Sequence, residues 1–203
     1  WSSSAASDVY KRQKYNVPRL AFINKMDRIG ANFDFVVDEL KKKLGANAVP
    51  IQIPIGSSDE FEGVIDLLLM KAYKFSEEDQ GSTVTSEEIP DHYIDKANAA
   101  RVKLIETLAE YDEDILGAFL EEKITKDLLI KSIRKCTISN LIIPTLTGSS
   151  LKNKGIQPLL DSVVNFLPSP VDVCSIEGIS AKNNSIIKRK TNVDDPLAGL
   201  VFK

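Results

Sequence analysis

Two short apolar runs, residues 17–23 and 141–146, are each followed by a polar loop and then by apolar residues at helical spacing. Such runs are typical of strands that are buried on both faces of a parallel sheet. The first predicted helix, residues 33–44, ends in three lysines before Gly45, and the second spans residues 155–166. The sequence therefore predicts two strand, loop, helix units and an α/β fold with a parallel sheet.

The segment between these units has a different pattern. Ile51, Ile53 and Ile55 alternate with Gln52 and Pro54, which is typical of an edge strand. The further elements expected here are strands at 61–67 and 71–75, a loop at 76–90, and helices at 94–110, 113–122 and 126–135. These elements predict a small α+β subdomain that is inserted between the two units.

The 203-residue chain is 43% apolar with a net charge of −3, so it can form one domain with an insertion and has no general attraction for nucleic acid. Two distant cysteines and one histidine indicate neither a disulfide framework nor a zinc site. The longest apolar stretch, residues 64–70, is interrupted by Asp66 and is too short to span a bilayer. We expect a soluble protein without a membrane partner.

The quartet Asn24-Lys25-Met26-Asp27 ends the first apolar run, where ligands of open α/β sheets bind. An ionised Asp27 only accepts hydrogen bonds, so it can take both N–H donors on the Watson–Crick edge of guanine, a pair that adenine lacks. The Asn24 amide suits the N7/O6 edge, and the Lys25 stem can lie along the ring face. The quartet therefore predicts a guanine site, with a purely structural turn as the alternative interpretation.

A second polar loop, Gly148-Ser149-Ser150-Leu151-Lys152, ends the other apolar run and could supply backbone N–H groups for guanine O6. The chain has no Gly-x-x-x-x-Gly-Lys-Ser/Thr loop that would hold phosphates and magnesium. We therefore assign no catalytic residue and no metal ligand to this chain. The residues predicted to bind guanine are Asn24, Lys25, Asp27, Ser149, Ser150 and Leu151.

Residues 15–33 and 148–161, together with the Leu-Pro-Ser-Pro sequence at 167–170, closely resemble the elongation factor G family of translational GTPases. The resemblance implies a partial P-loop-GTPase-type parallel sheet that lacks its N-terminal half and carries an inserted α+β subdomain. It implies GTP or GDP as the ligand, with Mg²⁺ and GTP hydrolysis expected only in the intact protein. The family more often has Ser-Ala where this chain has Ser149-Ser150. Because the base contact is expected through backbone N–H, the extra hydroxyl should matter little.

The resemblance also implies a domain arrangement and partners. From composition, we expect a non-native leader at 1–13, with a native disordered tail as the alternative, and a linker at 171–195. The resemblance implies a G-domain half at 14–50 and 139–170, the insert at 51–138, and the first strand of a truncated β-barrel domain at 196–203. The implied partners are the ribosome with its stalk protein and, through the ribosome, tRNA and mRNA during translocation. We expect a monomer in the bacterial cytoplasm, with the mitochondrial matrix as the alternative.

Two other interpretations of the chain stay open. One is a different translational GTPase, of the release-factor or ribosomal-protection type. The other is a non-enzymatic interaction module, in which the acidic helices of the insert bind a basic partner and the Asn-Lys-x-Asp turn is structural.

Overall fold

The computed structural model describes residues 17–76, 79, 81–172, 176–180, 183–189, 191–192 and 194. The expected leader at 1–13 and the expected strand at 196–203 lie outside these residues. The chain divides into two compact units, one that ends at Leu167 and one that begins at Pro168.

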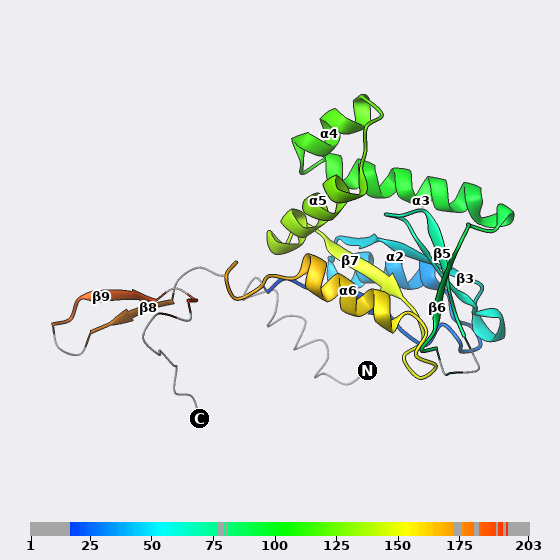
Figure 1. The fold of residues 1–203 in the computed structure, drawn as a ribbon, viewed down its shortest axis with the longest axis horizontal. Helices are drawn as coiled ribbons and strands as arrows, with labels where there is room; N and C mark the ends of the chain where they lie inside the picture. The colour runs from blue at the N-terminus through cyan, green and yellow to red at the C-terminus, as the bar shows by residue number, and fades with distance from the viewer. Residues whose placement is uncertain are drawn as a thin grey trace. The chain divides into compact units, whose positions relative to one another are not determined.

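The first unit is built on a three-stranded parallel sheet with the order β1-β7-β2. Residue 21 of β1 pairs with residue 145 of β7, and residue 23 with residue 147, so these two strands end at the same edge. In Figure 1, α6 passes in front of β7 and α2 lies behind it. The predicted α/β architecture is confirmed. The elements are β1 (Ala21–Ile23), α2 (Phe33–Leu44), β2 (Ala48–Pro50), β7 (Ile143–Thr147) and α6 (Ile156–Phe166).

The chain between β2 and β7 forms a four-stranded antiparallel sheet, with the order β3-β4-β5-β6, and three helices (Figure 1). The α+β character of the insert is confirmed, and β3 with its proline is an edge strand, as predicted. The elements are β3 (Gln52–Ile55), the short 3-10 helix η1 (Ser58–Glu60), β4 (Gly63–Asp66), β5 (Lys71–Phe75), β6 (Val84–Glu87), α3 (Asp91–Ala109), α4 (Glu113–Leu120) and α5 (Lys126–Ile138).

Strand β6 corrects one expectation, because the sequence predicts a loop throughout residues 76–90. Residues 84–87 instead pair with β5 in antiparallel register, with Val84 opposite Phe75. Three of its four residues are exposed, so they lack the apolar signal of a buried strand. The backbone hydrogen bonds of β5 make this segment a strand, and that partner is not visible in its own sequence.

Helix ends follow local chemistry. The Asn32 side chain accepts a hydrogen bond from the Phe35 N–H at 3.0 Å at the start of α2, and Gly45 ends that helix in the left-handed region at φ 58°. At the start of α5, the Thr125 hydroxyl accepts from the Leu128 N–H at 3.3 Å. Asn32 and Gly45 thus begin and end α2 at the bounds that the sequence predicts.

One hydrophobic core serves both the parallel sheet and the insert. Its buried members include Ile23 and Val37 from the first part and Ile65, Leu108 and Leu129 from the second. The insert is therefore packed into the same core as the sheet that carries the two predicted loops. None of the helices in the described ranges is long and apolar enough to cross a membrane.

The second unit contains an antiparallel hairpin of β8 (Ile176–Ile179) and β9 (Ile186–Arg189). It lies within residues 171–195, for which we expected a linker, and gives that segment two paired strands. The polar Asn183-Asn184 pair lies at the turn between the strands, and Asn184 adopts φ 53°. Asparagine tolerates this left-handed region, which makes the pair turn chemistry.

Candidate functional site

The two predicted loops lie side by side because β1 and β7 are parallel neighbours. The pairing continues past the strand ends, where the Gly148 N–H donates to the Ile23 carbonyl and the Met26 N–H donates to the Gly148 carbonyl, each at 3.1 Å. Met26 itself is buried at 2% exposure. It therefore anchors the quartet in the core, while its polar neighbours stay at the surface.

Asn24 ties the first loop to the second. Its Oδ1 accepts from the Lys25 N–H at 2.7 Å and from the Ser150 N–H at 2.9 Å. Its Nδ2 donates to the Ser150 Oγ at 2.8 Å. The oxygen is thus occupied by two donors, and one of the two N–H groups on Nδ2 remains for another acceptor.

Asp27 is held in its charged form by the second loop. A hydrogen bond from the Ser149 side chain is the main reason why the pKa of Asp27 lies below its ordinary value of 3.8. Partial burial acts in the opposite direction, and the positive charges of Lys152 and Arg28 add to the lowering. At neutral pH the carboxylate therefore offers negative oxygens at the mouth of the site.

Of the other predicted residues, Lys25, Ser150 and Leu151 lie at the surface of the same loops, whereas Ser149 is buried. Lys25 adopts φ 65° in the left-handed region and is exposed, and Leu151 is 81% exposed. The backbone N–H of Ser149 donates to the Lys154 carbonyl and that of Ser150 to Asn24. Within the described part of the chain, the Leu151 N–H has no hydrogen-bond acceptor. It is the backbone donor of this loop that is available to a ligand.

Lys154 is a residue of the site that the sequence does not reveal. It is 3% exposed, and its Nζ donates to the Phe61 carbonyl in the insert at 3.1 Å. Its backbone forms a bridge with Ser149, because each N–H donates to the other residue's carbonyl at 2.8 and 2.9 Å. A lysine in a polar loop is normally solvated, so no sequence signal indicates this burial.

The insert also holds the first loop. The Ser58 N–H donates to the Met26 carbonyl at 2.8 Å, and the Ser58 hydroxyl donates to the Arg28 carbonyl at 3.1 Å. One turn of the insert, residues 56–61, therefore bonds to the first predicted loop and to Lys154, two residues beyond the second. We call it the bracing turn.

The sequence profile described as "Elongation factor Tu GTP binding domain" matches residues 4–169, which include both loops. The chain belongs to this family. The predicted GTPase-type fold and the family resemblance are therefore confirmed.

Relatives of this GTP-binding domain chain include two bacterial proteins. It is 46% identical to "Elongation factor G 2" of Desulfotalea psychrophila and 48% identical to "Elongation factor G" of Thermotoga neapolitana, each over 191 residues. Both alignments cover 94% of this chain but only 28% and 27% of the relatives. The chain thus spans little more than a quarter of the length of the relatives it matches.

A solved structure with a similar fold is the crystal structure of ttk003000868 from Thermus thermophilus. It superposes with a TM-score of 0.68 at 24% identity and covers 80% of this chain and 24% of that one. This likeness supports the fold of the GTP-binding domain.

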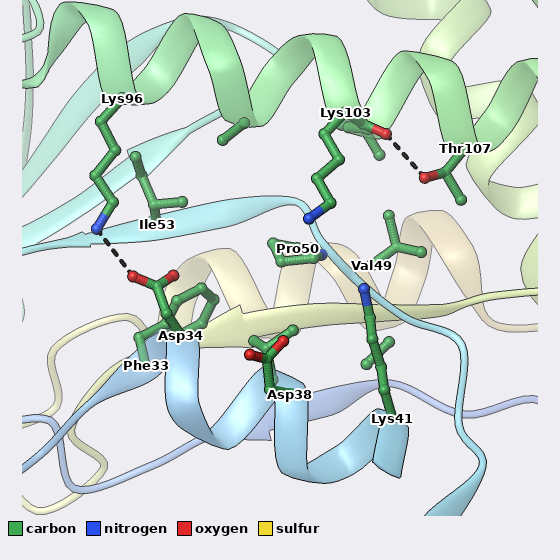
Figure 2. Close-up of a pocket in the computed structure, with 14 residues that line it drawn as sticks. Phe33, Asp34, Asp38, Lys41, Val49, Pro50, Ile53, Lys96, Lys103 and Thr107 are labelled. Atoms are coloured by element: carbon green, nitrogen blue, oxygen red, sulfur yellow. Dashed lines mark hydrogen bonds and ion pairs between the residues drawn. The ribbon is translucent and has the colours of Figure 1, made fainter.

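A concave region of the domain lies between α2 and α3 and has a volume of about 300 Å³ (Figure 2). Lys96 and Lys103 extend from α3 towards α2, and Lys96 pairs with Asp34 at 3.3 Å. Asp38 and Lys41 complete the charged lining. Three ammonium groups and two carboxylates nearly cancel, so the lining selects no ligand by charge. We therefore assign the candidate site to the two loops.

In the residues described, no group of three or more histidine, cysteine, aspartate or glutamate side chains is placed to hold a metal ion.

Proposed function

We propose that the two loops bind the guanine base of GTP or GDP, and that the chain is the base-reading part of a translational GTPase of the elongation factor G type. The observation that carries the proposal is the convergence of Asn24, Asp27 and residues 149–151 at one sheet edge. Membership of the GTP-binding domain family and similarity to elongation factor G support it.

Each residue has a separate task in this proposal. The Asp27 carboxylate accepts from the N1–H and 2-amino groups of guanine. The Leu151 N–H donates to O6, and the remaining N–H of Asn24 donates to N7. The Lys25 stem covers one face of the ring. Ser149 and Ser150 act through Asp27 and Asn24.

The same arrangement rejects adenine. Adenine carries an acceptor at N1 and an amino group at position 6, so Asp27 would face a lone pair and the Leu151 N–H would face donors. Mismatches of this kind leave polar groups of the site unpaired, and such sites discriminate strongly between ligands.

For the intact protein we propose GTP hydrolysis coupled to movement of tRNA and mRNA through the ribosome, with the ribosome and its stalk protein as partners. The catalytic groups, the phosphate-binding groups and the Mg²⁺ ligands belong to parts of the protein other than the residues assigned here. The names of the two bacterial relatives support an elongation-factor role and a bacterial source, and we propose a cytoplasmic location. We propose that the protein acts as a monomer.

The test is Asp27→Asn in the full-length protein that carries this chain. An asparagine amide presents N–H donors, which suit xanthine, because xanthine has a carbonyl oxygen where guanine has its 2-amino group. We expect GDP affinity to fall roughly a hundredfold, since charge-assisted hydrogen bonds are lost, and xanthosine diphosphate to become the preferred ligand. Asp38→Asn, on the exposed face of α2, makes the same charge change and should leave both affinities unchanged.

Calorimetric titration with both nucleotides gives the answer. An unchanged preference for GDP in the Asp27→Asn variant would refute the guanine assignment and leave the interaction module as the better explanation.

A further inference from the structure

The hydroxyl of Ser150 takes part in a closed pair of hydrogen bonds with Asn24. The Ser150 N–H donates to Asn24 Oδ1 at 2.9 Å, and Asn24 Nδ2 donates back to the Ser150 Oγ at 2.8 Å. The two residues are 126 positions apart in the chain. One side chain of the first loop and one residue of the second therefore hold each other at two points.

This pair fixes the orientation of the Asn24 amide. Oδ1 faces two backbone donors, those of Lys25 and Ser150, so the flipped amide would place N–H groups against N–H groups. With one hydrogen of Nδ2 directed at the Ser150 Oγ, the direction of the other is set by the planar geometry of the amide. Without the hydroxyl, Nδ2 would keep no acceptor among the described residues, and the amide would be held only at Oδ1, which leaves the direction of its N–H groups less well defined.

We propose that the Ser150 hydroxyl is a positioning group that holds the remaining Asn24 N–H towards N7 of the bound purine. In this proposal Ser150 acts on the base through Asn24, because its N–H donates to Asn24 Oδ1 and its Oγ accepts from Asn24 Nδ2. This inference rests on the proposed guanine site and adds the residue that determines recognition of the N7 edge. It also revises the expectation that the extra hydroxyl matters little.

The experiment compares GDP with 7-deaza-GDP, in which a C–H group replaces N7 and accepts no hydrogen bond. It uses the full-length protein with Ser150→Ala, and with Ser150→Thr as the variant that keeps a hydroxyl. Ser86→Ala, on an exposed position of β6, is the matched control. Affinities of both nucleotides are measured by calorimetry under one set of conditions.

We expect the wild-type protein and the Ser86→Ala variant to prefer GDP over 7-deaza-GDP. In Ser150→Ala, the affinity for GDP should fall about fivefold, as for one hydrogen bond, while that for 7-deaza-GDP should stay within about twofold. The ratio of the affinity for GDP to that for 7-deaza-GDP therefore becomes smaller than in the wild-type protein. Ser150→Thr should keep the wild-type ratio.

A purely structural role would weaken both nucleotides equally, so an unchanged ratio in Ser150→Ala overturns the proposal. A ratio that collapses in Ser150→Thr as in Ser150→Ala overturns it as well. Failure here is distinct from failure of the guanine assignment, because Asp27→Asn tests the opposite edge of the base and does not depend on N7.

Discussion

Gly148, the first residue of the second predicted loop, packs against the backbone of Lys154, so an alanine side chain does not fit at this position. An added Cβ would lie 2.3 Å from the Lys154 carbonyl oxygen and 2.8 Å from the Phe22 ring. Ordinary contact begins at 3.4 Å, so the carbonyl would have to retreat by about 1 Å in a close-packed interior. That oxygen accepts the Ser149 N–H at 2.8 Å, and such a retreat breaks the bond.

The cost follows from these contacts. Overpacking together with one broken hydrogen bond destabilises by about 2–4 kcal/mol. Alanine also lowers the conformational entropy of the unfolded chain, which stabilises the folded protein by about 0.4–1 kcal/mol and offsets part of this cost. We therefore expect Gly148→Ala to lower the free energy of unfolding by about 2 kcal/mol.

Urea titration with linear extrapolation measures this change. The matched control is Gly117→Ala in α4, where an added Cβ meets no atom within 4 Å outside its own helix and should raise stability by about 0.5–1 kcal/mol. The reasoning is refuted if the two variants change stability in the same direction, because the loop carbonyl would then not lie where it is described.

Capping and titration give two smaller effects. Thr125→Ala removes the oxygen that accepts the Leu128 N–H and should lower the unfolding free energy by about 1 kcal/mol, whereas Thr125→Ser should not; equal effects of the two substitutions would contradict the cap. The folded pKa of Asp27 lies below its unfolded value of 3.8, so the stability it contributes is fully present above that pH and is lost as pH falls through the folded pKa. The unfolding free energy should therefore vary less with acid pH in Asp27→Asn, and superimposable profiles would show that the Ser149 hydrogen bond adds no stability.

The bounds of α2 are predictable because its signals are local. Asn32 at its start, the lysines in its last turn and Gly45 beyond it all lie within one turn of an end. The strand-end rule likewise predicts that the two loops meet, since it needs only that β1 and β7 be parallel. Local chemistry and a general rule of sheet topology are sufficient for both.

The features that the sequence does not predict depend on distant partners. Strand β6 exists because β5 offers its backbone, and Lys154 is buried because the Phe61 carbonyl lies 93 residues away in sequence but within reach of its ammonium. The two hydrogen bonds between Asn24 and Ser150 likewise join residues that are far apart in the sequence. Residue types along the chain give the chemistry of each group but not the group it meets.

The bracing turn connects the inserted sheet by hydrogen bonds to the sheet edge that carries the proposed guanine site. Ser58 donates hydrogen bonds to the Met26 and Arg28 carbonyls of the first loop. The Phe61 carbonyl accepts one from the ammonium of Lys154, which follows the second loop. These bonds link the β3–β4 hairpin directly to the first loop of the proposed guanine site and, through Lys154, to the second.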